Sequence, residues 1–340
     1  MKKLLTWAMS LAIILVVVYT VSPKVKLQDL EGDYPTVPIN LDDLEAYIYQ
    51  KEDTVKGLKP NNEARIVWAD SVLKGKTPYS VVYIHGFGAS QMEGDPVHRQ
   101  LAEHFGANLY LARLSEHGIT RDNSLEHLTA DKLLADAREA YMIGKSLGEK
   151  VIIVGTSMGG ALSLTLASER PDLHALVLYS PCIREYGDQL DAFFQPWQSF
   201  LMEKMMTNEH GVLESPREGD KAKYWSEGFH VNAYSSLAVL LRSKMTDKTF
   251  KMINQPLFLA YYYKDEENQD RVVSVPAMLD MYEAVSTPET LKRKQAFPES
   301  GDHVIGSEIT SGDWKGVLDA TIDFLEEIAN VPHQVKAEAN

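Results

Sequence analysis

The sequence predicts an α/β fold with a mostly parallel central sheet, helices on both faces, and a helical cap inserted after the strand that ends near Ser180. Short apolar runs rich in β-branched residues alternate with segments of helical spacing, as in parallel sheets that are covered on both faces. The interval between the strand-like runs 174–180 and 256–263 is too long for an ordinary connection, so it predicts an inserted cap. With 340 residues, of which 44% are hydrophobic, the chain can bury a large core.

The N-terminal region, residues 1–23, predicts a membrane anchor or signal segment. Lys2 and Lys3 precede Leu4–Pro23, a stretch without any charged residue. That length suits a helix crossing a bilayer, whereas the apolar part of a cleaved signal peptide usually has about 7–15 residues. Lysines also follow the stretch, so the positive-inside rule only weakly favours a cytoplasmic N-terminus. We expect a membrane-anchored catalytic domain outside the cytoplasm; the alternative is a secreted or periplasmic protein after signal cleavage.

Residues 24–40 predict an extended tether, because they lack periodicity and contain a glycine and two prolines. Asn40 is placed to cap a helix over 41–53, and the core is expected to comprise 41–182 and 256–332. An edge strand is predicted at 64–69 and a buried strand at 79–84.

The stretch 151–160, VIIVGTSMGG, predicts a buried strand that delivers Ser157 into a tight turn before a helix. Gly155 and Gly159 complete the pattern G-x-S-x-G, in which the glycines leave room for a strained turn that exposes the serine hydroxyl. On its own this short pattern also fits a glycine-rich turn with a capping serine. The strand before it and the helix after it favour a nucleophilic Ser157.

A second motif, His85-Gly86-Phe87-Gly88, directly follows the predicted strand 79–84. Acyl transfer to a serine needs two preorganised N–H donors for the oxyanion, and a loop after a buried strand can supply one of them. We therefore expect the backbone N–H groups of Phe87 and Met158 to form the oxyanion hole. A plain β-turn is the structural alternative for this motif.

These two motifs, in this order, resemble the α/β-hydrolase superfamily. The stretch 113–120, RLSEHGIT, is similar to the loop that carries Gly-His-Gly in bacterial carboxylesterases and monoacylglycerol lipases. This chain has Glu116-His117-Gly118 at that place, so the resemblance implies the fold and the position of this loop near the site, but not the substrate. We expect a structural role for His117. Serine aminopeptidases resemble the same core and lid.

The resemblance also implies that residues 183–255 form the cap. This segment is rich in aromatic residues, some of which we expect to line a substrate pocket while the others pack in the core. They are Phe193, Phe194, Trp197, Phe200, Tyr224, Trp225, Phe229 and Tyr234.

After the cap, the chain offers a histidine and several acids in the order serine, acid, histidine that this fold uses. His303 lies in a loop between a strand-like segment and the C-terminal helix, and a neighbouring glycine allows it to reach the site. Asp270 precedes Val272 and Val273 and so resembles the family's D-x-V-V pattern. Asp265 lies closer to the end of the strand and stays open as the alternative acid.

The expected function is that of a serine hydrolase that cleaves a carboxylic ester through an acyl-enzyme, with Ser157, Asp270 and His303 as the triad. The expected partners are a small-molecule or lipid ester and, through the N-terminal segment, a membrane. We expect no metal and no cofactor. The formal charge of −14 argues against nucleic-acid binding. A serine aminopeptidase, a thioesterase and a non-catalytic binding module remain alternatives.

Overall fold

The computed structural model describes residues 2–22 and 24–333; Met1, Pro23 and 334–340 lie outside the described part. Its centre is a seven-stranded sheet in the order β1-β3-β2-β4-β5-β8-β9, in which only β1 runs antiparallel to its neighbour. The predicted mostly parallel α/β fold is therefore confirmed. The strands are β1 (Arg65–Val67), β2 (Thr77–Ile84), β3 (Asn108–Leu111), β4 (Gly148–Thr156), β5 (Ala175–Tyr179), β8 (Leu257–Tyr261) and β9 (Lys292–Ala296).

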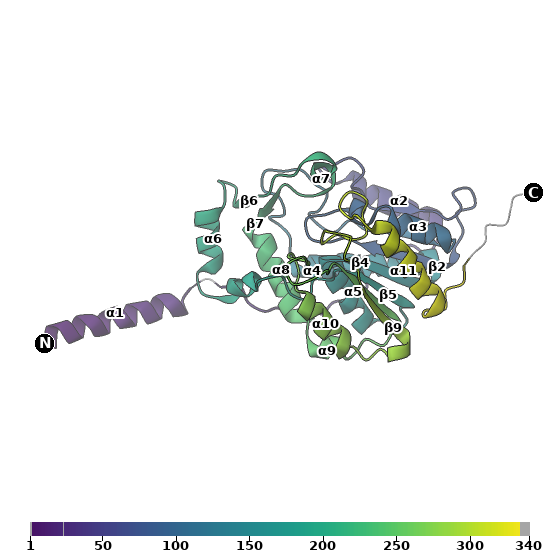
Figure 1. The fold of residues 1–340 in the computed structure, drawn as a ribbon. Coiled ribbons are helices and arrows are strands. Elements are labelled where there is room, and N and C mark those ends of the chain that lie inside the picture. Colours follow the sequence, from purple (N-terminus) through teal and green to yellow (C-terminus); the bar gives the residue numbers. More distant parts are fainter. Residues whose placement is uncertain (1, 23, 334–340) are drawn as a thin grey trace, which may run out of the picture.

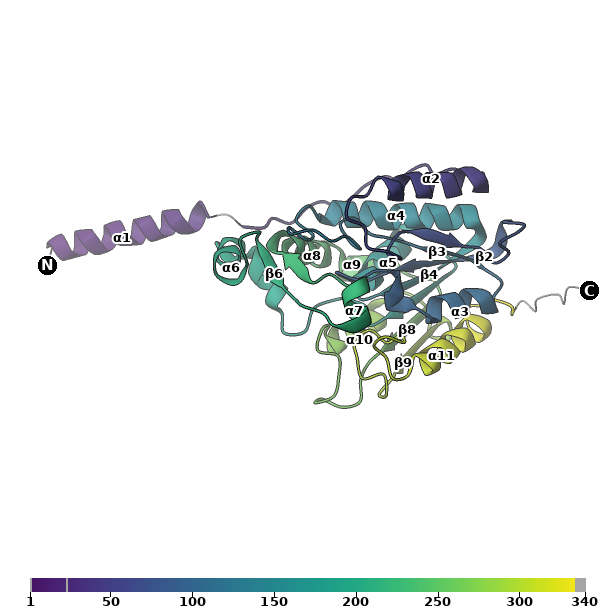
Figure 2. The ribbon, with the colours of Figure 1, turned by 90° about the horizontal axis from the view of Figure 1, so that it is seen from above.

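Helices cover both faces of this sheet, as Figure 2 shows from above. One face carries α2 (Leu41–Asp53), α4 (Ala130–Leu147), α5 (Met158–Glu169) and α10 (Val275–Ala284). The other carries α3 (Val97–His104) and α11 (Trp314–Glu327). Because both faces are buried, β2, β4, β5 and β8 have no alternation of exposed and buried residues along most of their length.

Local sequence signals placed several elements accurately. Asn40 caps α2, since its side chain accepts hydrogen bonds from the N–H groups of Asp42 and Asp43 at 2.9 and 3.1 Å. Gly148 follows α4 directly, and a Cβ atom there would lie 2.4 Å from the Ser80 nitrogen on β2. The sequence analysis missed β3, a four-residue strand that pairs with β1 and β2.

Between β5 and β8 lies the segment 183–255, here named the cap segment. It contains two 3₁₀ or short helical pieces, η2 (Gln189–Phe194) and α9 (Asp247–Phe250), and a small antiparallel pair of strands, β6 (Val212–Glu214) and β7 (Gly228–His230). Its helices are α6 (Gln198–Met206), α7 (Gly219–Tyr224) and α8 (Val231–Lys244). In Figure 1, α6, α7 and the β6–β7 pair stand at one end of the sheet.

The N-terminal region differs from the expectation. Residues Lys2–Thr20 form α1, which projects from the body in both views (Figures 1 and 2). In the described part of the chain, no helix combines the length and apolarity that crossing a bilayer requires. The membrane anchor expected at Leu4–Pro23 is therefore not supported; Pro23 itself lies outside the described residues.

The predicted tether, 24–40, contains no helix or strand, but part of it packs against the domain. Leu30 and Val37 are buried in the core, and the Leu30 carbonyl accepts a hydrogen bond from the Arg138 guanidinium on α4 at 3.2 Å. The Tyr34 hydroxyl donates to Glu169 at 2.9 Å. Burial of these apolar side chains therefore fixes this part of the segment to the surface of the domain.

Candidate functional site

Ser157 occupies a strained turn between β4 and α5. Its backbone has φ 54° and ψ −119°, a conformation that non-glycine residues rarely adopt. The Ser157 N–H donates to the Tyr179 carbonyl at 3.0 Å, and the Ser157 carbonyl accepts from the Cys182 N–H at 2.9 Å. One bond to the last residue of β5 and one to the segment that follows it thus hold the serine at the carboxyl edge of the sheet.

The glycines around this serine are needed for close packing. A Cβ atom on Gly159 would lie 2.0 Å from the Ile84 carbonyl oxygen, at the end of β2. One on Gly155 would lie 2.3 Å from the Ser163 hydroxyl. The helix α5 can approach the sheet this closely only because both positions lack side chains.

His303 and Asp270, from two separate loops after β8 and β9, meet in a buried hydrogen bond. The His303 Nδ1 lies 2.6 Å from Asp270 Oδ2. The other carboxylate oxygen accepts from the N–H groups of Val272 and Val273 at 2.8 and 3.0 Å. The Asp270 side chain is fully buried, so these contacts hold it in one orientation. The His303 Nε2 is buried and has no hydrogen-bond partner among the described residues, which leaves it available to a reacting group.

Two effects act in opposite directions on the pKa of His303. Burial alone lowers the pKa of this imidazole, but the negative charge of Asp270 and their hydrogen bond outweigh burial, so the net pKa is raised above 6.5. A carboxylate beside Nδ1 stabilises the imidazolium and places the Nε2 lone pair toward the cavity when the ring is neutral.

Asp265, the alternative acid, lies elsewhere. It is exposed in its loop, where one carboxylate oxygen accepts from the N–H groups of Glu267 and Asn268 at 2.9 and 2.8 Å. These backbone bonds lower its pKa. The structure brings Asp270, and not Asp265, to His303.

In the described part of the chain, the backbone N–H groups of Phe87 and Met158 donate no hydrogen bond. Met158 is the first residue of α5, where the N–H has no intrahelical acceptor and the helix dipole favours negative charge. Phe87 follows β2 by three residues, and its side chain lines the same cavity as Ser157. Both predicted oxyanion donors are therefore adjacent to the cavity.

Glu93 is a residue of this site that the sequence analysis missed. It is buried beside Ser157, and its carboxylate accepts from the Gly86 N–H at 2.5 Å and from the Tyr83 hydroxyl at 3.3 Å. Burial raises the pKa of Glu93 to about 7, and the charge of His303 opposes this shift. The carboxylate anchors the loop that carries Phe87. Its only sequence signal is its position shortly after the His-Gly-Phe-Gly motif.

Two further histidines are structural in their contacts. The His85 Nε2 accepts from the Leu114 N–H at 3.1 Å, and the His117 Nδ1 lies 2.8 Å from the Ser115 carbonyl. Their rings pack together with centroids 5.1 Å apart. Burial lowers the pKa of His117 to about 4, so the ring is neutral at physiological pH. Both connect the loop after β2 to the loop after β3.

A cavity of about 620 Å³ opens over Ser157 and His303, between the sheet edge and the cap segment. Its walls are mainly apolar, and four of the eight aromatic residues expected in the cap contribute to them. Those four are Phe193, Trp225, Phe229 and Tyr234. A mainly apolar cavity of this size with a few polar groups at one end is typical of small-molecule sites.

Comparison with known proteins agrees with this architecture. A family model described as "Serine aminopeptidase, S33" matches residues 75–298. A thermostable monoacylglycerol lipase of Bacillus sp. (strain H-257) is 32% identical over 100 residues, which cover 29% of this chain and 39% of that protein. The chain therefore aligns with less than half of the length of this relative.

Solved structures with the same fold include LipS and LipT, described as metagenome-derived lipolytic enzymes. That match has a TM-score of 0.61 at 19% identity and covers 79% of this chain and 99% of the other. A monoacylglycerol lipase of Paleococcus ferrophilus matches with a TM-score of 0.53 at 15% identity, over 77% of this chain and 99% of the other. Est1E of Butyrivibrio proteoclasticus with bound ferulic acid matches with a TM-score of 0.53 at 17% identity, over 78% of this chain and 95% of the other.

Proposed function

Since the chain belongs to the serine aminopeptidase S33 family of the α/β-hydrolase superfamily, we propose that it is a serine hydrolase that cleaves a carboxylic ester through an acyl-enzyme. The observation that carries the proposal is the buried Asp270–His303 pair, whose free Nε2 faces the cavity that Ser157 also lines. Ester-cleaving relatives with this fold support it.

In the proposed mechanism, Ser157 attacks the ester carbonyl while His303 Nε2 takes its proton. Asp270 holds the imidazole with Nδ1 protonated and stabilises the imidazolium that forms. The N–H groups of Phe87 and Met158 stabilise the oxyanion. The proton then passes from His303 to the leaving alkoxide, and water, activated by the same base, releases the acid and regenerates Ser157.

The mainly apolar walls of the cavity favour an ester with an acyl chain over a peptide with a free amino terminus. Three carboxylates also line the cavity, and each accepts a hydrogen bond within the protein: Glu93 from the Gly86 N–H, Glu185 from the Leu190 N–H, and Asp302 from the Val304 N–H and Lys221. The apolar walls suit an acyl chain better than a charged peptide end.

One cation in the cavity favours a second candidate substrate, a lysophospholipid. Arg217, from the cap segment, lines the cavity, and its Nε is buried without a hydrogen-bond partner in the described part of the chain. Tyr234 lines the same cavity, and burial raises the pKa of its hydroxyl while the charge of Arg217 opposes that rise. A guanidinium beside an apolar wall, with its Nε unpartnered among the described residues, matches an ester that has an acyl chain and a phosphate group.

Two measurements test these proposals. Fluorophosphonate should label Ser157, and a panel of nitrophenyl esters, thioesters and aminoacyl amides should show turnover of the esters. Turnover of the amides alone would contradict ester hydrolysis.

The second measurement compares the KM for 1-monoacylglycerol with the KM for 1-acylglycerol 3-phosphate of the same acyl chain. Arg217→Gln should raise KM for the phosphate ester roughly 10-fold or more, Arg217→Lys less, and neither should change KM for the neutral ester. Equal effects on both esters would refute the role of Arg217 without touching the triad.

We further propose that the enzyme works outside the cytoplasm, on the basis of the uncharged stretch at residues 4–22. Protease added to intact spheroplasts should degrade an enzyme that lies outside the cytoplasm, and sequencing of the mature N-terminus would distinguish an intact chain from a cleaved one. Full protection of the enzyme within the cytoplasm would contradict this location.

A further inference from the structure

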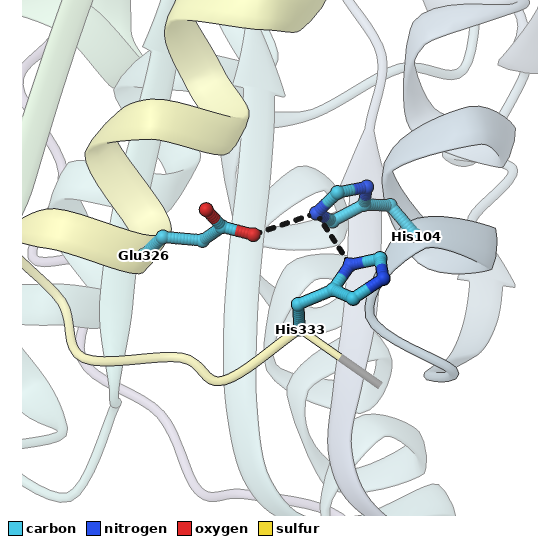
Figure 3. Close-up of side chains that lie close together, drawn as sticks. All are labelled: His104, Glu326 and His333. Atoms are coloured by element: carbon cyan, nitrogen blue, oxygen red, sulfur yellow. Dashed lines mark hydrogen bonds and ion pairs between the residues drawn. The ribbon is translucent and has the colours of Figure 1, made fainter. Parts of the chain in front are cut away.

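Three side chains with metal-binding atoms converge at a site that the proposed reaction does not use. His104 is the last residue of α3, Glu326 lies near the end of α11, and His333 lies in the segment that follows α11. Figure 3 shows the three side chains pointing toward one another. One ligand atom from each lies within 4.8 Å of the others, and none of the three lines the cavity over Ser157.

Hydrogen bonding alone accounts poorly for this arrangement. The His104 Nε2 lies 2.7 Å from Glu326 Oε1 and 2.9 Å from His333 Nδ1. A ring nitrogen either carries one hydrogen or offers one lone pair. If Nε2 carries the hydrogen, one proton must serve two acceptors. If it offers the lone pair to His333, a carboxylate oxygen faces that same lone pair. A cation among the three atoms would satisfy every lone pair at once.

The backbone holds these residues near one another. The helices α3 and α11 pack against each other over a shared apolar cluster. After α11, the Val331 N–H donates to the Leu325 carbonyl at 2.8 Å, and the Val331 side chain is buried. The chain is thus folded back two residues before His333. The rings of His104 and His333 have centroids 4.2 Å apart, and the site remains open to solvent on one side.

We propose that His104, Glu326 and His333 bind one divalent transition-metal ion of the Zn²⁺ type, with water as a fourth ligand. Two imidazole nitrogens and one carboxylate oxygen form a donor set that such ions prefer. At metal–ligand distances of about 2.0–2.2 Å, the ligand atoms of a tetrahedral site lie roughly 3.3–3.6 Å apart. The His104 nitrogen must therefore move away from each of its two partner atoms by roughly 0.4–0.9 Å, while the third pair already lies within 4.8 Å. The ion would fasten the C-terminal segment to α3 and α11.

The test uses the full, untagged chain after EDTA treatment and dialysis. Calorimetric titration with ZnCl₂ at pH 7.5 should show one ion per chain, and saturating Zn²⁺ should raise Tm by roughly 2 °C or more. His333→Ala and Glu326→Gln should each weaken binding at least about 10-fold. Binding should also weaken at pH 5, because protons compete for the ligand lone pairs. Co²⁺ substitution should give the visible absorption of a tetrahedral site.

His210→Ala is the matched control, since His210 is an exposed histidine that faces a single carboxylate, Glu209, at 3.7 Å. This variant should bind Zn²⁺ like the unmodified chain. Absence of binding to the unmodified chain, or binding that His333→Ala and Glu326→Gln leave unchanged, would overturn the proposal. Turnover of esters is not a readout here, so failure of the metal site and failure of the proposed function are distinguishable.

Discussion

Replacing Asp270 with asparagine tests the arrangement around His303 most directly. In the native structure, one Asp270 oxygen accepts from the Val272 and Val273 N–H groups, and the other faces His303 Nδ1 at 2.6 Å. The asparagine oxygen should stay with the two backbone donors, because turning the NH₂ group toward them would leave two buried donors unsatisfied, at about 1–3 kcal/mol each.

The NH₂ group of the asparagine would then face His303 Nδ1 and hold the imidazole in the wrong tautomer, with its proton on Nε2. Such a ring cannot accept the proton of Ser157. By analogy with the same change in serine proteases, kcat should fall by about 10⁴, which corresponds to about 5 kcal/mol of transition-state stabilisation. Because both backbone hydrogen bonds persist, the fold and Tm should change little.

The assay is kcat on a short nitrophenyl ester, measured for Asp270→Asn and Asp265→Asn in parallel with circular dichroism. Asp265 is exposed and bonded only within its own loop, so its variant should stay within roughly twofold of the unmodified enzyme. A kcat for Asp270→Asn within about tenfold of the native value would refute the tautomer argument. A larger loss in the Asp265 variant would move the acid to that residue.

Three further outcomes are expected. Ser157→Ala should abolish turnover and fluorophosphonate labelling while leaving the circular dichroism spectrum unchanged, since only a hydroxyl is lost. Turnover by this variant at the rate of the unmodified enzyme would exclude Ser157 as the nucleophile. The pH profile of kcat/KM should fall on the acid side through a pKa above 6.5, because the base must be neutral and the pKa of His303 is raised. An acid limb below 6.5 in the unmodified enzyme would contradict this. Glu93→Gln should move the limb to lower pH without removing it, because the negative charge of Glu93 contributes to the raised pKa of His303. Gly159→Ala should destabilise the protein by about 1–3 kcal/mol or more, measured by urea denaturation, because its Cβ would lie 2.0 Å from the Ile84 oxygen; unchanged stability would show that α5 can move away from the sheet.

Much of the fold followed from the sequence because the signals are local. The elbow depends on glycines two residues to either side of Ser157, and the backbone at Ser157 has the strained conformation that this spacing predicts. The start of α2 depends on one capping side chain, Asn40. Apolar runs with no alternation identified the buried strands β2, β4, β5 and β8. Each of these features is determined by a few consecutive residues.

The tertiary structure decided what depends on contacts between distant residues. Asp265 and Asp270 belong to one acidic loop, and only folding shows which carboxylate is turned inward to His303. The burial of Glu93 and of Leu30, the pairing of β3, and the convergence of His104 with Glu326 and His333 leave no periodic pattern in the sequence. The physical reason is that burial, desolvation and charge pairing depend on which distant segments the sheet and its helices bring together. The residues next to each other in the sequence do not determine those contacts.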